Sequence, residues 1–265
     1  MTLDLVAISD ALGSEIIASE RLAGGDISGA SQLRLADDRI VVAKSGPHSP
    51  TEARMLREIA ECDAPSPRVL ANGDDWFAME WIPAKHCRDR WGSLAETLRA
   101  LHSQTDRTWG WDENYAFSEV VIENAACGNW AQFWAERRLL CHLPHVDPSL
   151  GGRIERLCRR IAELLPAAPP RSLLHGDLWG GNIIWTEDAA WLIDPACYVG
   201  HREVDFAMLT LFDRPPDRFF ELCSLDPGWR KRQPLYRLWP WLVHLRLFGS
   251  SYRGQVDREL SALGF

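Results

Sequence analysis

The segment from His175 to Asp194 constrains this chain more than any other, because it contains three polar side chains at a defined spacing. Asn182 lies five residues after Asp177, and Asp194 lies seventeen residues after it. Asp177 stands in the glycine-rich run His175-Gly176-Asp177-Leu178-Trp179-Gly180-Gly181-Asn182, and an apolar stretch precedes Asp194. Glycine permits the tight backbone that directs a carboxylate out of a loop. The pattern therefore predicts a loop, followed by two short strands over residues 183–185 and 190–193.

These three side chains suit metal-assisted phosphoryl transfer. That reaction needs a group that accepts the proton of the attacking hydroxyl, and hard oxygen ligands for the Mg²⁺ that bridges the phosphates. We assign Asp177 as the catalytic base, and Asn182 and Asp194 as the Mg²⁺ ligands. An ordinary turn would explain Asp177 alone, but it would not explain the matching amide and carboxylate downstream.

A lysine and a glutamate nearer the N-terminus predict a nucleotide-binding pair. Lys44 ends a predicted strand, and Glu52 lies on the helix that follows. A lysine in this position can neutralise the α- and β-phosphates of ATP, and a glutamate can hold its ammonium group in place. Ser49 fits the N-cap of the helix and Pro50 its first position, so Glu52 could instead complete a capping box with Ser49. We favour the pair with Lys44.

Two further groups could support such a site. Gly24, Gly25 and Ser28 lie in a glycine-rich turn whose backbone N–H groups could cover the phosphates, although the Walker A pattern is absent. Asp205 could brace the catalytic loop near His175, because buried carboxylates anchor backbone N–H groups and histidines. An acidic residue favoured by the helix dipole explains Asp205 equally well.

The hydrophobic pattern predicts an α+β fold of two lobes, with the nucleotide between them. We expect a β-rich nucleotide-binding lobe over residues 1–82 and a larger helical lobe with the catalytic and substrate-binding residues over 83–265. The strands predicted for the first lobe cover residues 31–35, 39–44, 68–71 and 76–80. Helices are predicted over residues 1–18, from Ser49, from a capping box at Ser93, and over 128–141, 149–165, 202–212, 232–250 and 252–263, with a kink or restart at Pro240.

Composition excludes several classes of protein. The net charge of −8 argues against non-specific binding to nucleic acid. The seven cysteines include no Cys-x-x-Cys pair, which argues against a disulfide framework or structural zinc and favours the cytoplasm. No basic, apolar leader opens the chain, and the most apolar late stretch, residues 235–248, is interrupted by polar residues. We therefore expect no secretory signal and no membrane span.

At this point the sequence resembles the fructosamine kinase (ketosamine-3-kinase) family, a branch of the aminoglycoside- and choline-kinase-like phosphotransferases. The resemblance covers nearly the whole chain. The motifs that carry it are Gly24-Gly25-x-Ile27-Ser28, Lys44, Glu52-Ala53-x-x-Leu56, Leu101-His102, Asn124 with Trp130-x-x-Phe133 and Arg138-Leu139, the run from His175 to Asn182, Ile193-Asp194-Pro195-Ala196-x-Tyr198-x-Gly200-His201-Arg202-Glu203-x-Asp205, Leu225-Asp226-Pro227-Gly228 and His244-x-x-x-Phe248-Gly249.

The resemblance implies a protein-kinase-like fold and ATP- and Mg²⁺-dependent phosphorylation of the 3-hydroxyl of a ketosamine, the adduct formed when a sugar glycates an amine. Phosphorylation makes the adduct labile, so the activity would be deglycating. The acceptor would be a small molecule or a glycated protein, and we expect a monomer. By motif position, Glu80, Trp81 and Ile82 would contact adenine, and Trp179, His201 and Trp130 would contact the substrate. The helical spacing of Trp130 and its aromatic neighbours by itself favours a core role.

Two other functions stay open. The acceptor could be an aminoglycoside, choline or another hydroxylated amine, and Trp179 suits any of these, because an aromatic ring can stack on a sugar or an amine. The chain could also be a non-catalytic nucleotide-binding protein, although the set of Lys44, Asp177, Asn182 and Asp194 argues against that.

Overall fold

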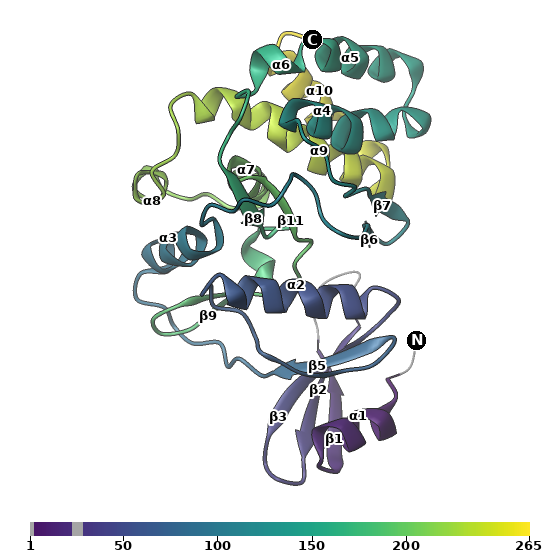
Figure 1. The fold of residues 1–265 in the computed structure, drawn as a ribbon, viewed down its shortest axis with the longest axis vertical. Helices are drawn as coiled ribbons and strands as arrows, with labels where there is room; N and C mark the ends of the chain where they lie inside the picture. The colour runs from purple at the N-terminus through teal and green to yellow at the C-terminus, as the bar shows by residue number, and fades with distance from the viewer. Residues whose placement is uncertain (1–2, 23–28) are drawn as a thin grey trace. The chain divides into compact units, whose positions relative to one another are not determined.

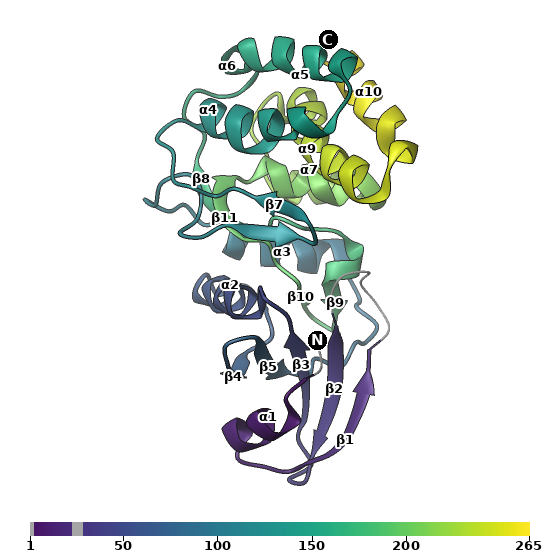
Figure 2. The ribbon, with the colours of Figure 1, turned by 90° about the vertical axis from the view of Figure 1, so that its right-hand side faces the viewer.

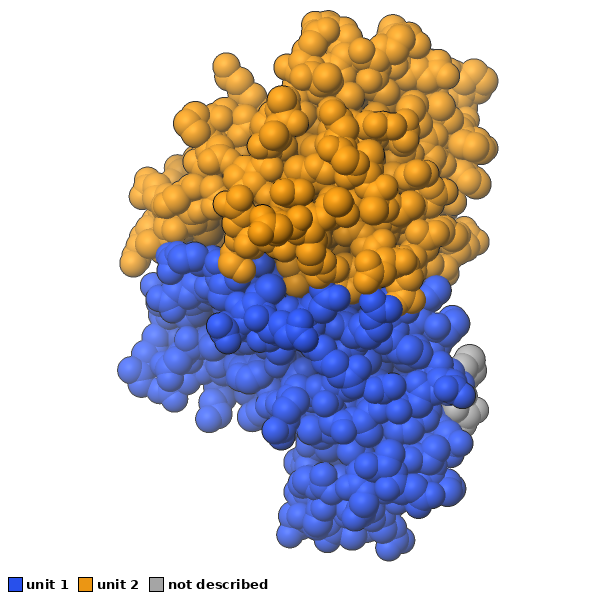
Figure 3. Space-filling view, in the orientation of Figure 1, with its two compact units in different colours: residues 1–101, 180–196 blue, residues 102–179, 197–265 orange. Residues whose placement is uncertain are grey.

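The computed structural model describes residues 3–22 and 29–265 and divides into two compact units (Figure 3). Unit 1 comprises residues 1–101 and 180–196, and unit 2 comprises residues 102–179 and 197–265. The chain thus returns to unit 1 directly after the loop that contains Asp177. The two units are defined by how compactly their residues pack. The separation into functional lobes between residues 82 and 83 stays a prediction.

Unit 1 is built on a five-stranded antiparallel sheet with the strand order β1-β2-β3-β5-β4 (Figure 1). The four strands predicted for this region are confirmed within one or two residues. The fifth, β1, was not predicted and forms an edge of the sheet. The strands are β1 (Ile16–Arg21), β2 (Ala30–Leu35), β3 (Ile40–Ser45), β4 (Val69–Asn72) and β5 (Trp76–Glu80).

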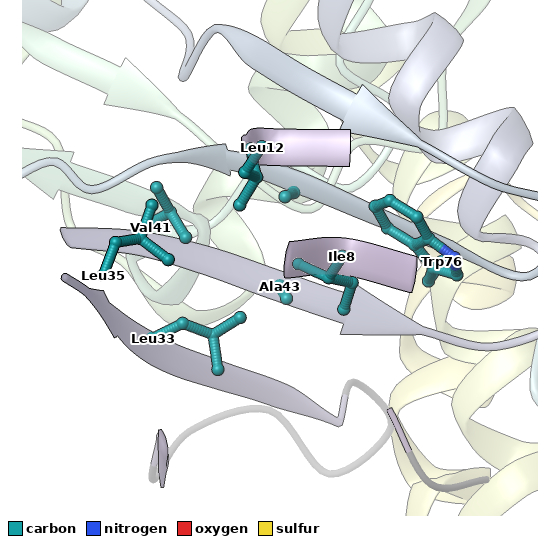
Figure 4. Packing of buried hydrophobic residues seen from close by; sticks show 8 residues of the cluster. Ile8, Leu12, Leu33, Leu35, Val41, Ala43 and Trp76 are labelled. Carbon is teal, nitrogen blue, oxygen red and sulfur yellow. The ribbon is translucent and has the colours of Figure 1, made fainter. Parts of the chain in front are cut away.

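Each face of this sheet carries one helix, because successive residues of a strand point to opposite sides. Helix α1 (Leu5–Leu12) packs its Ile8 and Leu12 on a face that includes Val41 of β3 (Figure 4). Helix α2 (Ser49–Glu61) packs on the other face, in a cluster that includes Val42 (Figure 2). The even-numbered residues of β3 therefore lie on the side of α2, and this parity decides where Lys44 points.

The helix predicted over residues 1–18 is wrong in its second half. Helix α1 ends at Gly13, which adopts a left-handed conformation with φ of 67° and donates its N–H to Asp10 and Ser9 carbonyls. A glycine reaches this conformation without steric cost, so it terminates helices readily. Ile16 and Ile17 lie within the predicted helix, but they belong to β1.

Unit 1 also contains helix α3 (Arg90–Leu101) and the hairpin of β9 (Ile183–Trp185) and β10 (Ala190–Leu192). The predicted start of α3 at Ser93 is wrong. Asp89 accepts the N–H of Gly92 with its side chain and that of Ser93 with its carbonyl, so the helix begins one turn earlier. Thr97 of α3 donates to the Ala190 carbonyl, which attaches the helix to the hairpin.

Unit 2 is mainly helical, and helices α7 and α9 form much of its core (Figures 1 and 2). The predicted helices are confirmed in position, although the one over 128–141 begins as α-helix and continues as a π-helical and then a 3₁₀ segment. The helices are α4 (Trp130–Trp134), α5 (Pro148–Arg159), α6 (Ile161–Leu164), α7 (Glu203–Phe212), α8 (Asp217–Leu222), α9 (Trp229–Phe248) and α10 (Arg253–Ala262).

Two short antiparallel pairs complete unit 2. Strands β8 (Arg171–Leu174) and β11 (Tyr198–His201) form one pair, and β6 (Tyr115–Phe117) and β7 (Val120–Ile122) form the other. Helix α9 continues through Pro240, so the predicted restart there is wrong. None of the helices in the described part of the chain has the length and hydropathy needed to span a bilayer. The predicted α+β class is confirmed.

Candidate active site

A buried cluster of one ammonium group and two carboxylates lies in unit 1. Lys44 Nζ donates to Glu52 Oε1 at 2.5 Å and to Asp194 Oδ1 at 3.0 Å. Lys44 and Glu52 are almost completely buried, and the Asp194 side chain is 27% exposed. Because Lys44 lies on the face of β3 that α2 covers, the parity of the strand directs it to Glu52. The direct bond to Asp194, 150 residues away, was not predicted.

Burial and charge act against each other in this cluster. Burial raises the pKa of Glu52, and the Lys44 ammonium only partly opposes that effect. Burial also disfavours the charged form of Lys44, but the two carboxylates outweigh it and raise the pKa of the ammonium. Lys44 therefore stays positively charged, as a group that binds phosphate must.

The alternative role of Glu52, capping Ser49, is wrong. His48 is the N-cap residue of α2, Ser49 is already the first helical residue, and no side chain caps this end. The Glu52 carboxylate pairs with Lys44 instead. A buried ammonium without a partner costs more free energy than an uncapped N–H at the start of a helix. The Glu52 carboxylate therefore pairs with Lys44 and does not cap the helix.

Asn182 and Asp194 flank the β9–β10 hairpin of unit 1. Ile183 pairs with Leu192, and just beyond them Ile193 N–H donates to the Asn182 carbonyl at 3.1 Å. The hairpin thus brings together the two residues that the spacing assigned to Mg²⁺. Asp194 has a left-handed φ of 54°, a conformation that non-glycine residues adopt rarely. One amide and one carboxylate are the hard oxygen donors that Mg²⁺ prefers, so the residues fit this ion.

The remaining nucleotide-binding candidates are also in unit 1. Glu80 ends β5, Trp81 follows it and packs on the cluster under α2, and Ile82 is buried. Glu80 Oε2 accepts the N–H of Arg68, so the Glu80 side chain stabilises the β4–β5 part of the sheet. The backbone of Glu80, and not its side chain, suits a hydrogen bond to adenine. Gly24, Gly25 and Ser28 lie outside the described residues.

The predicted catalytic loop begins in unit 2, where β8 ends at Leu174. Asp205 on α7 is fully buried and accepts the backbone N–H of His175 at 2.8 Å and of Gly176 at 2.9 Å. Gly176 has a positive φ of 81°, and the N–H of Asp177 points to His175 Nδ1 at 3.3 Å. These contacts hold the two residues before Asp177 and match the brace proposed for Asp205.

Trp179, two residues after Asp177, lies against an aromatic group that the sequence did not identify. Its ring meets Phe212 edge-on at 5.9 Å, and Phe212 contacts His244 at 5.5 Å. Phe212 is the last residue of α7 and is 44% exposed. The sequence contains one signal for this position: Phe212 directly precedes Asp213-Arg214-Pro215-Pro216, where the prolines end the helix.

Two predicted substrate contacts are wrong. Trp130 and His201 are both 0% exposed, and each bonds to Tyr236 Oη: Trp130 Nε1 donates at 3.0 Å, and His201 Nδ1 lies at 2.7 Å. His201 also pairs with Arg171, at the end of the β8–β11 ladder opposite to the catalytic loop. Trp130 and its aromatic neighbours are therefore core, and Tyr236 on α9 bonds to Trp130 Nε1 and to His201 Nδ1.

A second polar cluster surrounds His201 but does not suit a metal ion. Its Nε2 lies 3.7 Å from Glu203 and 3.9 Å from Asp226. Arg232 donates to both oxygens of Glu203, at 2.8 and 2.5 Å, and Arg202 lies 3.6 Å from Asp226. Two guanidinium groups thus supply the positive charge that a cation would bring, so we assign no metal there.

Two buried histidines should make the fold sensitive to acid. Burial lowers the pKa of His142 and of His201 to about 3. Unfolded histidine titrates near pH 6.5, so the unfolded chain binds more protons between pH 6.5 and 3, and stability falls as the pH falls through that range. Each histidine contributes a slope of about 1.4 kcal/mol per pH unit. His142→Leu should therefore flatten the pH dependence of the unfolding free energy by one proton, measured by urea titration. An unchanged slope would contradict the buried neutral state.

Comparisons of the sequence and the fold with those of known proteins give consistent results. The sequence model of the fructosamine kinase family matches residues 4–263. A protein of Thermus thermophilus named probable ketoamine kinase is 32% identical, over 91% of this chain and 92% of its own. A crystal structure from Thermobifida fusca, solved as a candidate fructosamine-3-kinase, has a TM-score of 0.90 with 28% identity, covering 98% of this chain and 97% of its own. The gentamicin complex of the aminoglycoside phosphotransferase APH(2")-IIa, 16% identical with a TM-score of 0.64, covers 99% and 96% and shares the kinase-like fold.

Proposed function

Because this chain belongs to the fructosamine kinase family, we propose that it transfers the γ-phosphate of ATP to the 3-hydroxyl of a ketosamine. The observation that carries the proposal is the Lys44–Glu52–Asp194 cluster, because a buried lysine held by two carboxylates is a device for binding phosphate. The relative from Thermus thermophilus is named as a ketoamine kinase, which supports the same class of acceptor.

We assign the residues of unit 1 to the nucleotide. Glu52 holds the ammonium of Lys44 in place for the α- and β-phosphates, and the backbone of residues 80–82 binds adenine. Asn182 and Asp194 would hold Mg²⁺, which supplies charge neutralisation on the phosphates when bound. Gly24, Gly25 and Ser28 are assigned to the phosphates on the sequence pattern alone.

Asp177 accepts the proton of the sugar hydroxyl as that oxygen attacks the phosphorus. Asp205 supports the assignment, because it holds the backbone of His175 and Gly176 and so limits the movement of the base. The exposed face of Trp179 and Phe212 receives the sugar or its amine, which carries a positive charge that aromatic faces attract. Decay of the phosphorylated adduct would release the amine, which is deglycation.

A panel of acceptors tests the proposal. The protein is incubated with ATP and Mg²⁺ together with a fructosamine, a ribulosamine, a glycated protein, an aminoglycoside or choline, and ADP release is measured. We expect turnover with ketosamines, and a 3-phosphate product identified by NMR. Turnover restricted to an aminoglycoside or to choline would favour the alternative acceptors. If the protein consumes no ATP with any acceptor of an extended panel, this result would favour a non-catalytic nucleotide-binding protein.

Trp179→Ala should raise the KM for the ketosamine by about 5- to 20-fold and leave the KM for ATP within about twofold. An aromatic contact with a cationic amine contributes about 1–2 kcal/mol, which corresponds to this factor. Steady-state kinetics with each substrate varied in turn would measure both constants. Trp229→Ala is the matched control, since Trp229 stacks on Phe220 at 4.6 Å elsewhere in unit 2. An equal rise in both KM values would contradict the acceptor role.

The compartment and the assembly state belong to the same proposal. All seven cysteines are among the described residues, and no disulfide joins any of them. We infer a protein of the reducing cytoplasm that acts as a monomer, with neither nucleic acid nor a membrane as its partner.

A further inference from the structure

We propose that an aromatic strip beside Trp179 binds the amine portion of the ketosamine and makes the protein selective for ketosamines of apolar amines; the inference rests on the proposed kinase function. The strip consists of Phe212, His244, Phe248 and Tyr252. The ring centroid of Phe212 lies 5.9 Å from that of Trp179. The ring of His244 follows at 5.5 Å from Phe212, and that of Phe248 at 5.5 Å from His244. All of these residues belong to unit 2, so their arrangement is that of one compact body.

The end of α9 and the turn after it bring three of these rings together. His244 and Phe248 are four residues apart in the helix, so they lie on one face of it. The helix ends at Gly249, whose positive φ of 84° suits glycine and lets the chain turn back. Tyr252 thereby returns to the helix, with its ring 5.1 Å from that of His244 and 5.9 Å from that of Phe248. The strip is therefore a continuous aromatic face that begins at Trp179.

Two large apolar side chains of the strip are exposed to water. Phe212 is 44% exposed and Phe248 is 48% exposed, and both rings contact that of His244. No other phenylalanine, tyrosine or tryptophan in residues 3–22 and 29–265 is as exposed. Adjacent exposed apolar side chains commonly mark a surface that a ligand or a partner covers. Because this surface continues directly from the face assigned to the acceptor, the part of the acceptor that lies beyond the sugar is the occupant that fits.

The chemistry of the strip suits an amine with hydrocarbon substituents. The nitrogen of a ketosamine is an amine that carries a proton at neutral pH, and aromatic faces attract such a cation. His244 Nδ1 donates to the Pro240 carbonyl at 2.7 Å, and burial lowers the pKa of the imidazole. The ring is therefore uncharged at neutral pH and does not repel the ammonium group. Hydrocarbon groups on the nitrogen would cover Phe248, whereas a small amine would leave it exposed.

A series of fructosamines that share the sugar and differ only in the amine tests this assignment. The amines are methylamine, hexylamine and phenethylamine. Phe248→Ala removes the outer ring of the strip, and Phe248→Leu retains an apolar side chain without the ring. Leu222→Ala is the matched control, because Leu222 is also an exposed apolar residue of unit 2, on helix α8. The readouts are kcat/KM for each fructosamine, with ATP and Mg²⁺ present, and its Kd by calorimetry without ATP.

We expect the wild type to prefer the hexylamine and phenethylamine adducts over the methylamine adduct at least about tenfold in kcat/KM, because each buried methylene group favours binding. Phe248→Ala should lower kcat/KM for the phenethylamine adduct by about 3- to 10-fold and leave the methylamine adduct within about twofold. Phe248→Leu should retain most of the preference for the hexylamine adduct, and Leu222→Ala should change nothing.

Equal kcat/KM across the series, or a preference that persists in Phe248→Ala, would overturn the inference and leave the kinase function intact. Self-association that Phe248→Ala abolishes, measured by sedimentation, together with no preference among the amines, would assign the strip to a second copy of the chain instead. If no fructosamine is phosphorylated, the kinase function fails. The Kd values need no turnover, so they still decide whether the strip binds apolar amines.

Discussion

Replacing Asp177 with asparagine should lower kcat by about 10²- to 10⁴-fold, which is the contribution of a positioned general base. Asparagine has nearly the same shape, but its amide cannot accept the proton of the sugar hydroxyl. The support of the loop should persist, because Asp205 bonds the backbone of His175 and Gly176 and makes no use of the Asp177 side chain in those bonds. The dissociation constant of ATP should stay within about twofold.

Single-turnover kinetics and ATP titration together measure this effect. Asp106→Asn is the matched control, since Asp106 is an exposed carboxylate of the same unit. A variant at position 177 that turns over at a near-normal rate would end the assignment of the base. Equal losses of kcat and ATP affinity would indicate that Asp177 binds the nucleotide instead.

The second large effect is expected at Lys44, in both stability and nucleotide binding. Lys44→Met removes the donor shared by Glu52 and Asp194 and leaves two carboxylates near each other in a largely buried site. Breaking a buried ion pair from one side costs about 3–5 kcal/mol, because the remaining charge has no compensation. ATP affinity should fall about 30-fold or more, the effect of losing roughly 2 kcal/mol of charge pairing with phosphate.

The double variant Lys44→Met, Glu52→Gln separates these two effects. It also removes the charge of Glu52, one of the two carboxylates left without a partner, so it should recover part of the unfolding free energy without recovering ATP affinity. Urea unfolding and ATP titration of the two variants provide both quantities. A single variant as stable as the wild type would contradict the ion pair, and normal ATP affinity would contradict its role in binding phosphate.

Local sequence patterns predicted much of the fold. The alternation of Val41, Val42 and Lys44 along β3 gives each residue a face of the sheet, and the start of the helix over residues 49–61 was predicted from Ser49 and Pro50. The pairing of Lys44 with Glu52 follows from these two elements, since strand parity and helix position are both local properties.

Some errors have a local cause, and others arose where a residue's partner is distant in the chain. Ser49 was predicted as the N-cap of α2, but it is the first helical residue. Glu52 forms no capping box with it, because the Glu52 carboxylate pairs with the buried ammonium of Lys44. Trp130 and His201 looked like substrate contacts, but Tyr236 supplies a bond to each of them. Their burial depends on how α4, β11 and α9 pack, and no local pattern contains that information.

By itself the sequence provided the candidates for the chemistry of this protein: a carboxylate for the base, two oxygen ligands and a lysine, at spacings that a loop and a hairpin can present. It also determined the α+β class, because the periods of its apolar residues are local. Only the tertiary structure decided which polar residues serve the core, that Asp194 shares Lys44 with Glu52, and that Asp205 holds the catalytic loop. These outcomes depend on charges and hydrogen-bonding groups that must find partners when water is excluded, and the partners come from segments far apart in the chain.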